Sequence, residues 1–201
     1  MRVYLLRHGE TDWNTVRRLQ GSVDIPLNAT GIRQAESWRP HFDGMNLDGI
    51  YSSSLDRALH TAALATGRPA CIIPDFNERD FGIWEGRTWS DLESTVSEFD
   101  ERWNDNNFYP PGGESRFDLY HRVHRALSQT VGEHDEDHEI LIVAHGASGH
   151  AIMSSLLKHP IDARATLPIL TNASLTIMDV HDGEASLAGQ VALPFLMRGA
   201  L

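Results

Sequence analysis

Two histidines occupy matching places in this sequence of 201 residues, each at the end of an apolar run and each followed by glycine. The run at residues 2–6 leads to His8, and the run at residues 139–144 leads to His145. Both runs are typical of buried strands, and functional groups in open α/β sheets gather beyond the carboxyl ends of such strands. If the two strands are neighbours, both imidazoles face one pocket. One histidine of this kind alone would more simply cap its strand by a hydrogen bond.

Arginines accompany the two histidines. Arg7 directly precedes His8, and Arg57 lies in the first turns of a helix expected after the serines at residues 52–54. The start of that helix is expected to offer free backbone N–H groups, which attract anions. A planar guanidinium binds phosphate oxygens in pairs. These groups around one point predict a phosphoryl ligand, although Arg57 alone would also fit a surface ion pair with Asp56 or a nearby acid.

The elements that would position these residues alternate between strands and helices. Such alternation predicts an α/β fold, a three-layer α/β/α sandwich with a mostly parallel central sheet. No change of composition marks a domain boundary, so residues 1–201 are expected to form a single domain. Strands are expected at residues 2–6, 48–51, 70–73, 139–144, 174–180 and 185–192, and helices at residues 30–42, 55–65, 88–104, 114–133 and 148–157.

Composition argues against several classes of protein. The net charge is −11 with no basic stripe, so no nucleic-acid partner is expected. No apolar run is long enough for a membrane span, and the N-terminus turns charged after six residues, unlike a signal peptide. Cys71 is the only cysteine, which excludes a disulfide framework and makes a cytoplasmic location the expectation. Because Cys71 stands in the apolar run at residues 70–73, we expect a buried, inert thiol.

Two other kinds of hydrolase site fit the sequence poorly. A serine at position 148 follows a strand, but a serine nucleophile elbow needs glycine where His150 stands. The 11 histidines include two pairs at helical spacing, yet no third ligand is expected beside either pair, His121/His124 or His134/His138. We therefore expect neither a serine nucleophile nor a bound metal ion.

The segment Leu6–Asn14 resembles the signature of the histidine phosphatase superfamily, which includes the cofactor-dependent phosphoglycerate mutases. A lone Arg-His-Gly would be weak evidence, but the resemblance continues in the expected order over nearly the whole chain. It implies the phosphoglycerate mutase-like fold. The further matching segments are residues 20–21, 24–28, 31–35, 51–58, 61–62, 77–86, 111–115, 143–146 and 172–174.

The resemblance implies a role for each residue at the two strand ends. His8 would attack phosphorus and form a phosphohistidine, which splits one hard displacement into two easier ones. One ring nitrogen would attack while the other donates to a backbone carbonyl. Arg7, Arg57 and His145 would hold the non-bridging oxygens. No cofactor is implied, and further phosphate-binding positions are expected at Asn14, Gln20, Gly21, Gly146 and Ala147.

The leaving alcohol needs a proton, and in the resembling families an acid after the third strand supplies it. Glu78 matches that position and is the expected acid, with Glu85 as its competitor. Such an acid works best with a raised pKa, and a nearby negative phosphate would shift a carboxyl in that direction. A simpler role for Glu78 would be a surface ion pair with Arg79.

Phosphatases and mutases share this chemistry and differ in where the phosphoryl group goes next. The resembling mutases carry basic residues, lysine included, after the acid motif, whereas residues 86–111 contain only Arg87 and Arg102 together with several acids. This departure favours the small phosphatase branch and a small phosphate ester as substrate. A phosphoglycerate mutase is the alternative, and a catalytically silent phosphate-binding module is the second alternative.

Two segments each allow two interpretations. The loop at residues 106–109 would either cap the pocket and select the substrate or pack as a surface loop. The apolar segment Val191–Met197 would either pack inside the fold or form the contact of a homodimer.

Overall fold

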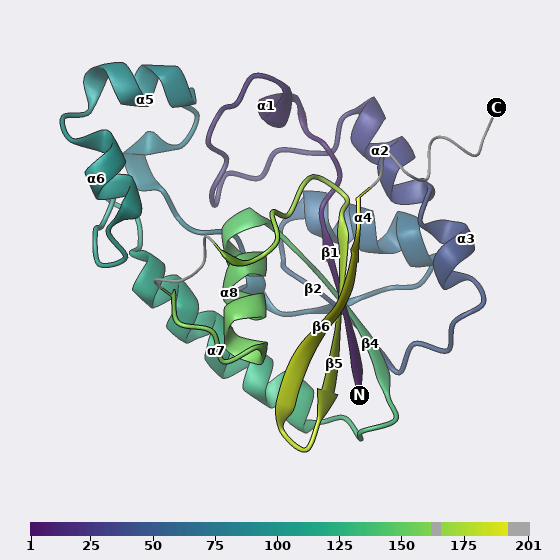
Figure 1. Cartoon of the computed structure of the whole chain (residues 1–201). Coiled ribbons are helices and arrows are strands. Elements are labelled where there is room, and N and C mark those ends of the chain that lie inside the picture. The colour runs from purple at the N-terminus through teal and green to yellow at the C-terminus, as the bar shows by residue number, and fades with distance from the viewer. Residues whose placement is uncertain (162–165, 193–201) are drawn as a thin grey trace.

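The computed structural model describes residues 1–161 and 166–192, which form one six-stranded sheet with helices on both sides (Figure 1). The strand order is β3-β2-β4-β1-β5-β6. The first four strands of the chain pair in parallel, and β5 and β6 add antiparallel to one side. The predicted sandwich with a mostly parallel sheet is confirmed. The strands are β1 (Arg2–Arg7), β2 (Gly49–Ser52), β3 (Cys71–Ile72), β4 (Glu139–Ala144), β5 (Leu175–His181) and β6 (Glu184–Val191).

Each face of the sheet supports its own hydrophobic core. Leu5 and Ile142 belong to one core, and the next residues along the same strands, Leu6 and Val143, belong to the other. Side chains alternate between the faces of a strand, so strands covered on both faces are apolar throughout. The helices are α2 (Ala29–Glu36), α3 (Arg39–Phe42) and α4 (Asp56–Thr66) on one side, and α7 (Arg116–Gly132) and α8 (Gly146–Leu156) on the other.

The first strand of the chain lies in the middle of the sheet. β1 pairs with β4 in parallel, with Arg7 opposite Ala144, and with β5 in antiparallel register. Because β1 and β4 end side by side, His8 and His145 leave the sheet together. The sequence-based expectation that both histidines face one pocket depended on this pairing, and the pairing is confirmed.

Two short helices project beyond the sheet beside the start of α7 (Figure 1). They are α5 (Trp89–Thr95) and α6 (Phe99–Asn104), where a single helix over residues 88–104 was expected. The break comes at Glu98, whose φ of +55° places it in the left-handed region. An aromatic cluster that includes Phe81 and Trp84 packs beneath both helices.

The helix expected over residues 30–42 is also divided. It ends at Glu36, and α3 begins at Arg39 with Pro40 in its first turn. Proline has no N–H to donate and fits the first turn of a helix, so it marks a new start here. A one-turn helix, α1 (Asp12–Thr15), was not expected from the sequence. Thr11 caps it, and the side chain of Asn14 bonds back to the Thr11 backbone.

The prediction of a buried thiol at Cys71 is wrong, because Cys71 is exposed. It lies in β3, which is only two residues long and forms the edge of the sheet. Its neighbour Ile72 is 53% exposed as well. An apolar run is typical of a buried strand, but its composition does not show that the run stands at an uncovered edge.

Among residues 1–161 and 166–192, no helix has the length and apolar character required to cross a bilayer. Of the apolar segment at residues 191–197, only residues 191 and 192 are described, and Val191 packs against the core that contains Leu6. The two interpretations of residues 193–197 lie outside the described residues.

Candidate active site

His8 follows the last residue of β1 and is 3% exposed. Its Nδ1 lies 2.7 Å from the carbonyl oxygen of Gly9. A carbonyl can only accept, so Nδ1 carries the proton and Nε2 keeps its lone pair. The expected bond from one ring nitrogen to a backbone carbonyl is therefore present, and Nε2 is the nitrogen able to attack phosphorus.

The surroundings of His8 keep its imidazole neutral. Burial lowers the pKa of His8 well below 6.5, and the charges of Arg7 and Arg57 lower it further, against an opposing effect of the Gly9 carbonyl. Only the neutral ring has a lone pair to offer phosphorus. The site therefore holds His8 in its nucleophilic form at neutral pH.

His145 lies beside His8, with the ring centroids 5.1 Å apart. Its Nδ1 accepts from Nε of Arg57 at 3.2 Å, so its Nε2 carries a proton and donates to Oγ of Ser53 at 2.7 Å. Burial, followed by the charge of Arg57, lowers the pKa of His145 well below 6.5. The ring is thus neutral and fixed in orientation. Ser53 contacts His145 directly, whereas in the sequence it stood out only as one of the serines before an expected helix.

Arg57 is 1% exposed and is therefore not a surface residue, although its Nη1 lies 3.9 Å from Oδ1 of the nearby acid Asp24. Its Nη1 donates to the carbonyl of Val23 at 2.8 Å and its Nη2 to the carbonyl of Gly21 at 2.7 Å. With the bond to His145, these contacts use three of the five N–H donors of a guanidinium. Arg57 therefore ties the loop after α1 to His145, and its positive charge acts on both histidines.

The start of α4 does not offer the free N–H groups that the sequence predicted. Asp24 accepts from the backbone N–H of Asp56 at 2.9 Å, and Asn77 accepts from the N–H of Ser54 at 2.8 Å. Carboxylates stabilise helix N-termini by the same attraction that binds phosphate there. This expected anion site is therefore occupied by the chain itself.

Arg7 faces the site from the end of β1. Its Nη1 donates to the carbonyl of Leu170, whereas its buried Nε has no hydrogen-bond partner among the described residues. A buried donor left unpaired costs about 1–3 kcal/mol, which a bound anion would recover. Burial lowers the pKa of Arg7 and the carboxylate of Glu78 opposes that shift, so a negative group lies close to this guanidinium.

Asn14 is linked to His8 through Asn172, and Gln20 carries a buried polar group in the loop after α1. The Oδ1 of Asn14 accepts from Nδ2 of Asn172 at 3.1 Å and from the N–H of Thr11 at 3.0 Å, which leaves the amide N–H₂ of Asn14 as the donor. The Oε1 of Gln20 is buried with no hydrogen-bond partner among the described residues. Asn172, to which the sequence analysis gave no role, also donates to the carbonyl of His8 at 3.2 Å.

Gly21 acts through its backbone. Its carbonyl accepts from Arg57, and its φ is +56°. A Cβ at this position would lie 2.0 Å from Oε1 of Glu85, so glycine is required by space as well as by conformation.

Glu78 lies at the N-terminus of α8. Its carboxylate accepts from the backbone N–H of Ala147 at 3.0 Å, of Ser148 at 3.0 Å and of Arg79 at 2.9 Å. The Ala147 N–H, expected to bind phosphate, donates to Glu78 instead. Gly146 stands between Glu78 and Arg7, since a Cβ there would lie 3.4 Å from Glu78 Oε2 and 3.8 Å from Arg7 Cζ.

A half-buried ion pair holds the segment that carries Glu78. Arg122 of α7 donates to the carbonyl of Glu78 at 3.0 Å and to the carbonyl of Asp75 at 2.6 Å. The same guanidinium pairs with the carboxylate of Glu114, which also accepts from the N–H of Asp80 at 3.1 Å. Arg122 was not predicted as part of the site. Its partner Glu114 lies in the matching segment 111–115, which was the one sequence feature that pointed to this contact.

Glu85, the competitor of Glu78, connects two loops. Its carboxylate accepts from the N–H of Ser22 at 2.7 Å and from the N–H of Phe81 at 3.1 Å. The Ser22 hydroxyl donates to both of its oxygens. This carboxylate is occupied in holding the loop after α1 against the segment after β3.

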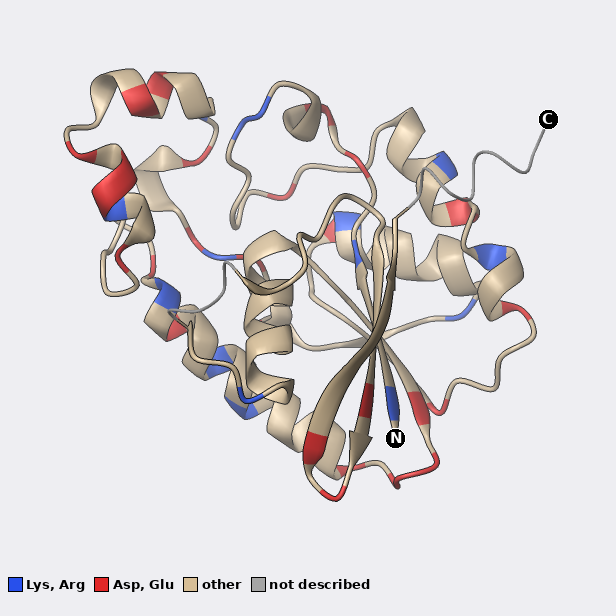
Figure 2. Cartoon of the chain, viewed as in Figure 1, with Lys and Arg blue, Asp and Glu red and all other residues tan. Residues whose placement is uncertain are grey.

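The acidic loop before β4 gathers three metal-ligand side chains, which the sequence analysis did not expect. Asp135, Asp137 and His138 bring one ligand atom each within 4.8 Å of one another. The two aspartates are exposed, and the loop precedes β4 whereas His145 follows it, so the group stands at the opposite end of the strand from the histidines. In the cartoon of Figure 2, red segments mark acidic residues at this end of the sheet and on α5 and α6.

The lowered pKa values predict how stability depends on pH. Below about pH 6.5 the unfolded chain takes up protons on His8 and His145 that the folded protein excludes. Since the unfolded state then binds more protons, the free energy of unfolding falls as pH decreases, by up to about 1.4 kcal/mol per pH unit for each histidine. Urea unfolding between about pH 7 and pH 5 measures this slope.

The control for the pH dependence of the free energy of unfolding is His8→Gln, which removes one of the two titrating histidines. The variant is expected to lose less stability per pH unit than the wild type. Equal slopes in the two proteins would show that His8 titrates in the folded protein as it does in the unfolded chain.

Comparisons with known proteins agree with this geometry. The family model of the histidine phosphatase superfamily (branch 1) matches residues 3–191. The sequence is 36% identical over 177 residues to the uncharacterized phosphatase PhoE of Bacillus subtilis (strain 168), covering 87% of this chain and 86% of that protein. It is 34% identical over 200 residues to the probable phosphoglycerate mutase GpmB of Salmonella typhi, covering 95% of this chain and 90% of that protein.

The structure is also similar to that of a mycobacterial glucosyl-3-phosphoglycerate phosphatase in complex with VO3. The TM-score is 0.84 at 31% sequence identity, over 92% of this chain and 96% of that chain.

Proposed function

The chain belongs to the histidine phosphatase superfamily, and we propose that it hydrolyses a small phosphate ester through a phosphohistidine on His8. The state of His8 carries this proposal, because a buried neutral imidazole with Nδ1 bonded to a carbonyl has only Nε2 available for attack. Arg7 and Arg57 place positive charge beside it, where a phosphoryl group would be negative.

The proposed reaction has two displacements. In the first, the Nε2 lone pair of His8 attacks phosphorus and the bond from phosphorus to the ester oxygen breaks, while protonated Glu78 gives its proton to that oxygen. In the second, the Glu78 carboxylate takes a proton from water, the water oxygen attacks phosphorus, and the N–P bond breaks. Inorganic phosphate leaves, and His8 and Glu78 return to their starting states.

The surrounding donors would stabilise the transferring group. Arg57 has N–H donors beyond those bonded to the protein, and the Nε of Arg7 and the amide of Asn14 are further donors. His145 would act with them by donating from Nε2, where Ser53 now accepts. Electrostatic stabilisation by fixed donors is the main contribution that a protein makes to phosphoryl transfer.

The contacts of the two carboxylates support Glu78 as the acid. Glu78 lies next to Gly146 and affects the pKa of Arg7, and this proximity supports a role for it at the proposed phosphoryl site. Glu85 is engaged with Ser22 and Phe81, so its loss would disturb the loops without removing a proton donor.

The two arginines in residues 86–111, the segment before α7, support hydrolysis over mutase activity. Arg87 pairs with Asp91 at 2.6 Å, and Arg102 lies 3.6 Å from Glu98. Neither arginine lines the cavity beside Arg7. The two cations of residues 86–111 are thus bound to acids of their own helices and are not placed to hold a second phosphate.

Phosphate release from a panel of esters tests the proposed function. The panel would contain 3-phosphoglycerate, sugar phosphates, nucleotides, α-ribazole phosphate and glucosyl-3-phosphoglycerate, each with and without a strong chelator. We expect release that survives chelation. Interconversion of 2- and 3-phosphoglycerate in the presence of 2,3-bisphosphoglycerate, faster than phosphate release, would favour the mutase. Phosphate binding with neither activity would favour the silent module.

Replacing Glu78 with glutamine is expected to affect esters according to their leaving groups. An alkoxide needs a proton to leave, so alkyl phosphates should lose about 10²–10⁴-fold in kcat, whereas aryl phosphates should lose much less because a phenolate is a better leaving group. The ratio of the two losses measures the proton donation.

Glu85→Gln is the matched control for that experiment. It weakens the contacts to Ser22 and Phe81 and is expected to lower both activities in the same proportion. Equal losses on alkyl and aryl esters in Glu78→Gln would exclude Glu78 as the acid.

A further inference from the structure

A cavity of about 490 Å³ opens beside the proposed phosphoryl site, which is more space than a phosphoryl group fills and is typical of small-molecule sites. Arg7, Gly146 and Ala147 contribute to its lining. Gly146 also adjoins the carboxylate of Glu78, the proposed donor of a proton to the leaving oxygen. The organic part of the substrate is attached to that oxygen and would therefore extend into the cavity.

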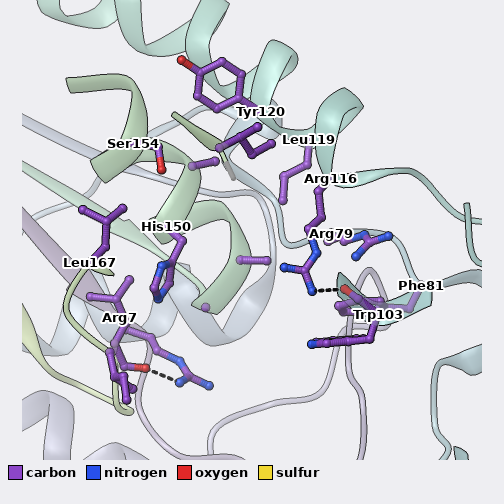
Figure 3. A pocket seen from close by; sticks show the side chains of 16 residues that line it. Arg7, Arg79, Phe81, Trp103, Arg116, Leu119, Tyr120, His150, Ser154 and Leu167 are labelled. Atoms are coloured by element: carbon purple, nitrogen blue, oxygen red, sulfur yellow. Dashed lines mark hydrogen bonds between the residues drawn. The ribbon is translucent and has the colours of Figure 1, made fainter. Parts of the chain in front are cut away.

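The helix α8 forms one wall of this cavity. The lining residues of α8 are one, three or four positions apart, so they share one face of the helix. They are Gly146, Ala147, His150, Ala151 and Ser154. Because an α-helix rises about 1.5 Å per residue, Ser154 lies about 12 Å along α8 from Gly146. Figure 3 shows Arg7, His150 and Ser154 in this order along the cavity.

Apolar side chains make up much of the remaining lining. They include Leu119 of α7 and, in the segment between α8 and β5, Leu167 and Leu170. Such side chains bury the carbon skeleton of a ligand but form no hydrogen bonds with it. A polar group on the ligand therefore needs a partner from another part of the lining.

Ser154 places a hydroxyl in this lining. The residue is 2% exposed, and its Oγ has no hydrogen-bond partner among residues 1–161 and 166–192. Three other buried hydroxyls in helices of this chain bond the carbonyl four residues earlier, namely those of Thr61, Thr66 and Thr130. A buried polar group without a partner is costly, so the Ser154 hydroxyl is available to a group that enters the cavity.

We propose that Ser154 is a specificity-determining residue, which binds a hydroxyl or carbonyl group near the far end of an extended apolar leaving group. This proposal rests on the proposed function and adds its substrate class. A serine hydroxyl both donates and accepts, so either kind of group would pair with it. A leaving group with only carbon at this point would displace water from Ser154 and leave its hydroxyl unpaired.

Two esters with a two-ring leaving group test this role. Both are biphenyl phosphates with the phosphate at the para position of one ring. The para position of the other ring carries a hydroxymethyl group in the first ester and an ethyl group in the second. These substituents have nearly the same size, and they are too far from the leaving oxygen to alter its basicity much. The quantity measured is the alcohol-to-ethyl ratio of kcat/KM within one enzyme, which cancels any general loss of activity in a variant.

Ser154→Ala removes the hydroxyl and keeps the helix, since alanine is the strongest helix former. We expect the alcohol-to-ethyl ratio to be about tenfold lower in Ser154→Ala than in the wild type, because the alcohol loses a hydrogen bond and the ethyl group gains an apolar contact. Ser154→Cys should give an intermediate ratio, because a thiol keeps the shape but is a weaker donor.

Ser155→Ala is the matched control. The Oγ of Ser155 lies 2.7 Å from Nδ1 of His124, and neither residue lines the cavity, so the ratio in this variant should equal that of the wild type. Phenyl phosphates with the same two para substituents test the length of the site. Their single ring is too short to reach Ser154 from the phosphoryl site, so Ser154→Ala should leave their ratio unchanged. An effect as large as that on the two-ring pair would contradict the proposed position of the bound group.

Equal two-ring ratios in the wild type and Ser154→Ala would overturn the proposal, since water and not the substrate would then pair with the hydroxyl. Failure of the wild type to hydrolyse either two-ring ester, with phenyl phosphate hydrolysed, would overturn it as well. In both cases hydrolysis of phenyl phosphate leaves the proposed function intact and only the role of Ser154 is wrong. No hydrolysis of any of these esters would count against the phosphatase itself.

Discussion

Replacing His8 with alanine is expected to lower kcat for phosphate release by about 10⁴-fold or more, because no other lone pair is placed to attack phosphorus. The fold should persist, because the backbone of residue 8 forms hydrogen bonds to distant segments that do not depend on the imidazole ring. Its N–H donates to Ala144, and its carbonyl accepts from Ala173 and Asn172. Phosphate release and thermal unfolding of the two proteins provide the measurement.

Trapping the intermediate makes this experiment decisive. A phosphohistidine survives alkaline quenching and hydrolyses in acid, so phosphate should stay on the wild-type protein after a base quench and be absent from His8→Ala. His124→Ala is a matched control, since His124 bonds only to Ser155 on the outside of α7 and α8. Phosphate that stays on His8→Ala after the base quench would assign the nucleophile to another residue.

Replacing Arg57 with glutamine is expected to reduce kcat/KM by about 10³-fold, in the range found when a transition-state arginine is removed from other phosphoryl-transfer enzymes. The charge of Arg57 also lowers the pKa of His8. Without it, the pKa of His8 rises and the ring becomes protonated at higher pH. The acid limb of the pH profile of kcat/KM should therefore move to higher pH in the variant.

The matched control for Arg57→Gln is Arg39→Gln, which removes an exposed arginine paired with Asp43 on α3. It should leave both the rate and the pH profile unchanged. Arg57→Lys separates charge from geometry, because lysine keeps the charge but cannot bond Val23, Gly21 and His145 at once. A loss of rate in Arg57→Gln with the acid limb at its original pH would mean that Arg57 acts through hydrogen bonds alone.

The layout of the site was predictable because it follows from strand ends. His8 and His145 each follow an apolar run, and parallel pairing of adjacent strands brings such ends together. The tautomer of His8 was not predictable from the sequence, because only the structure shows that Nδ1 bonds the carbonyl of the next residue, Gly9.

Contacts between distant segments were not predictable in this way. Asp24 fills the N-terminus of α4 across 32 residues, and Glu78 fills the N-terminus of α8 across 69. Sequence patterns indicate that a helix N-terminus can bind an anion. They do not show whether that anion is a ligand or a carboxylate from a distant part of the chain. The link from Arg122 to the segment of Glu78 was missed for the same reason.

The two helix breaks and the exposure of Cys71 depend on different causes. Pro40 marks a boundary that the sequence contains, because proline favours the first turn of a new helix. Glu98 adopts a left-handed conformation without glycine, so the break before α6 has no comparable signal. The exposure of Cys71 depends on the position of β3 in the sheet, which an apolar run does not encode.

The central position of β1 has a consequence for synthesis of the chain. β1 leaves the ribosome long before its partners β4 and β5, which begin only at residues 139 and 175. Until then an apolar strand has two unpaired edges, a condition that favours aggregation of a nascent chain. The carbonyl of His8 also lacks its hydrogen-bond donors until Asn172 and Ala173 have been synthesised. The proposed nucleophile is therefore synthesised well before the residues that complete its surroundings, so a chain interrupted before residue 172 would carry His8 without an assembled site.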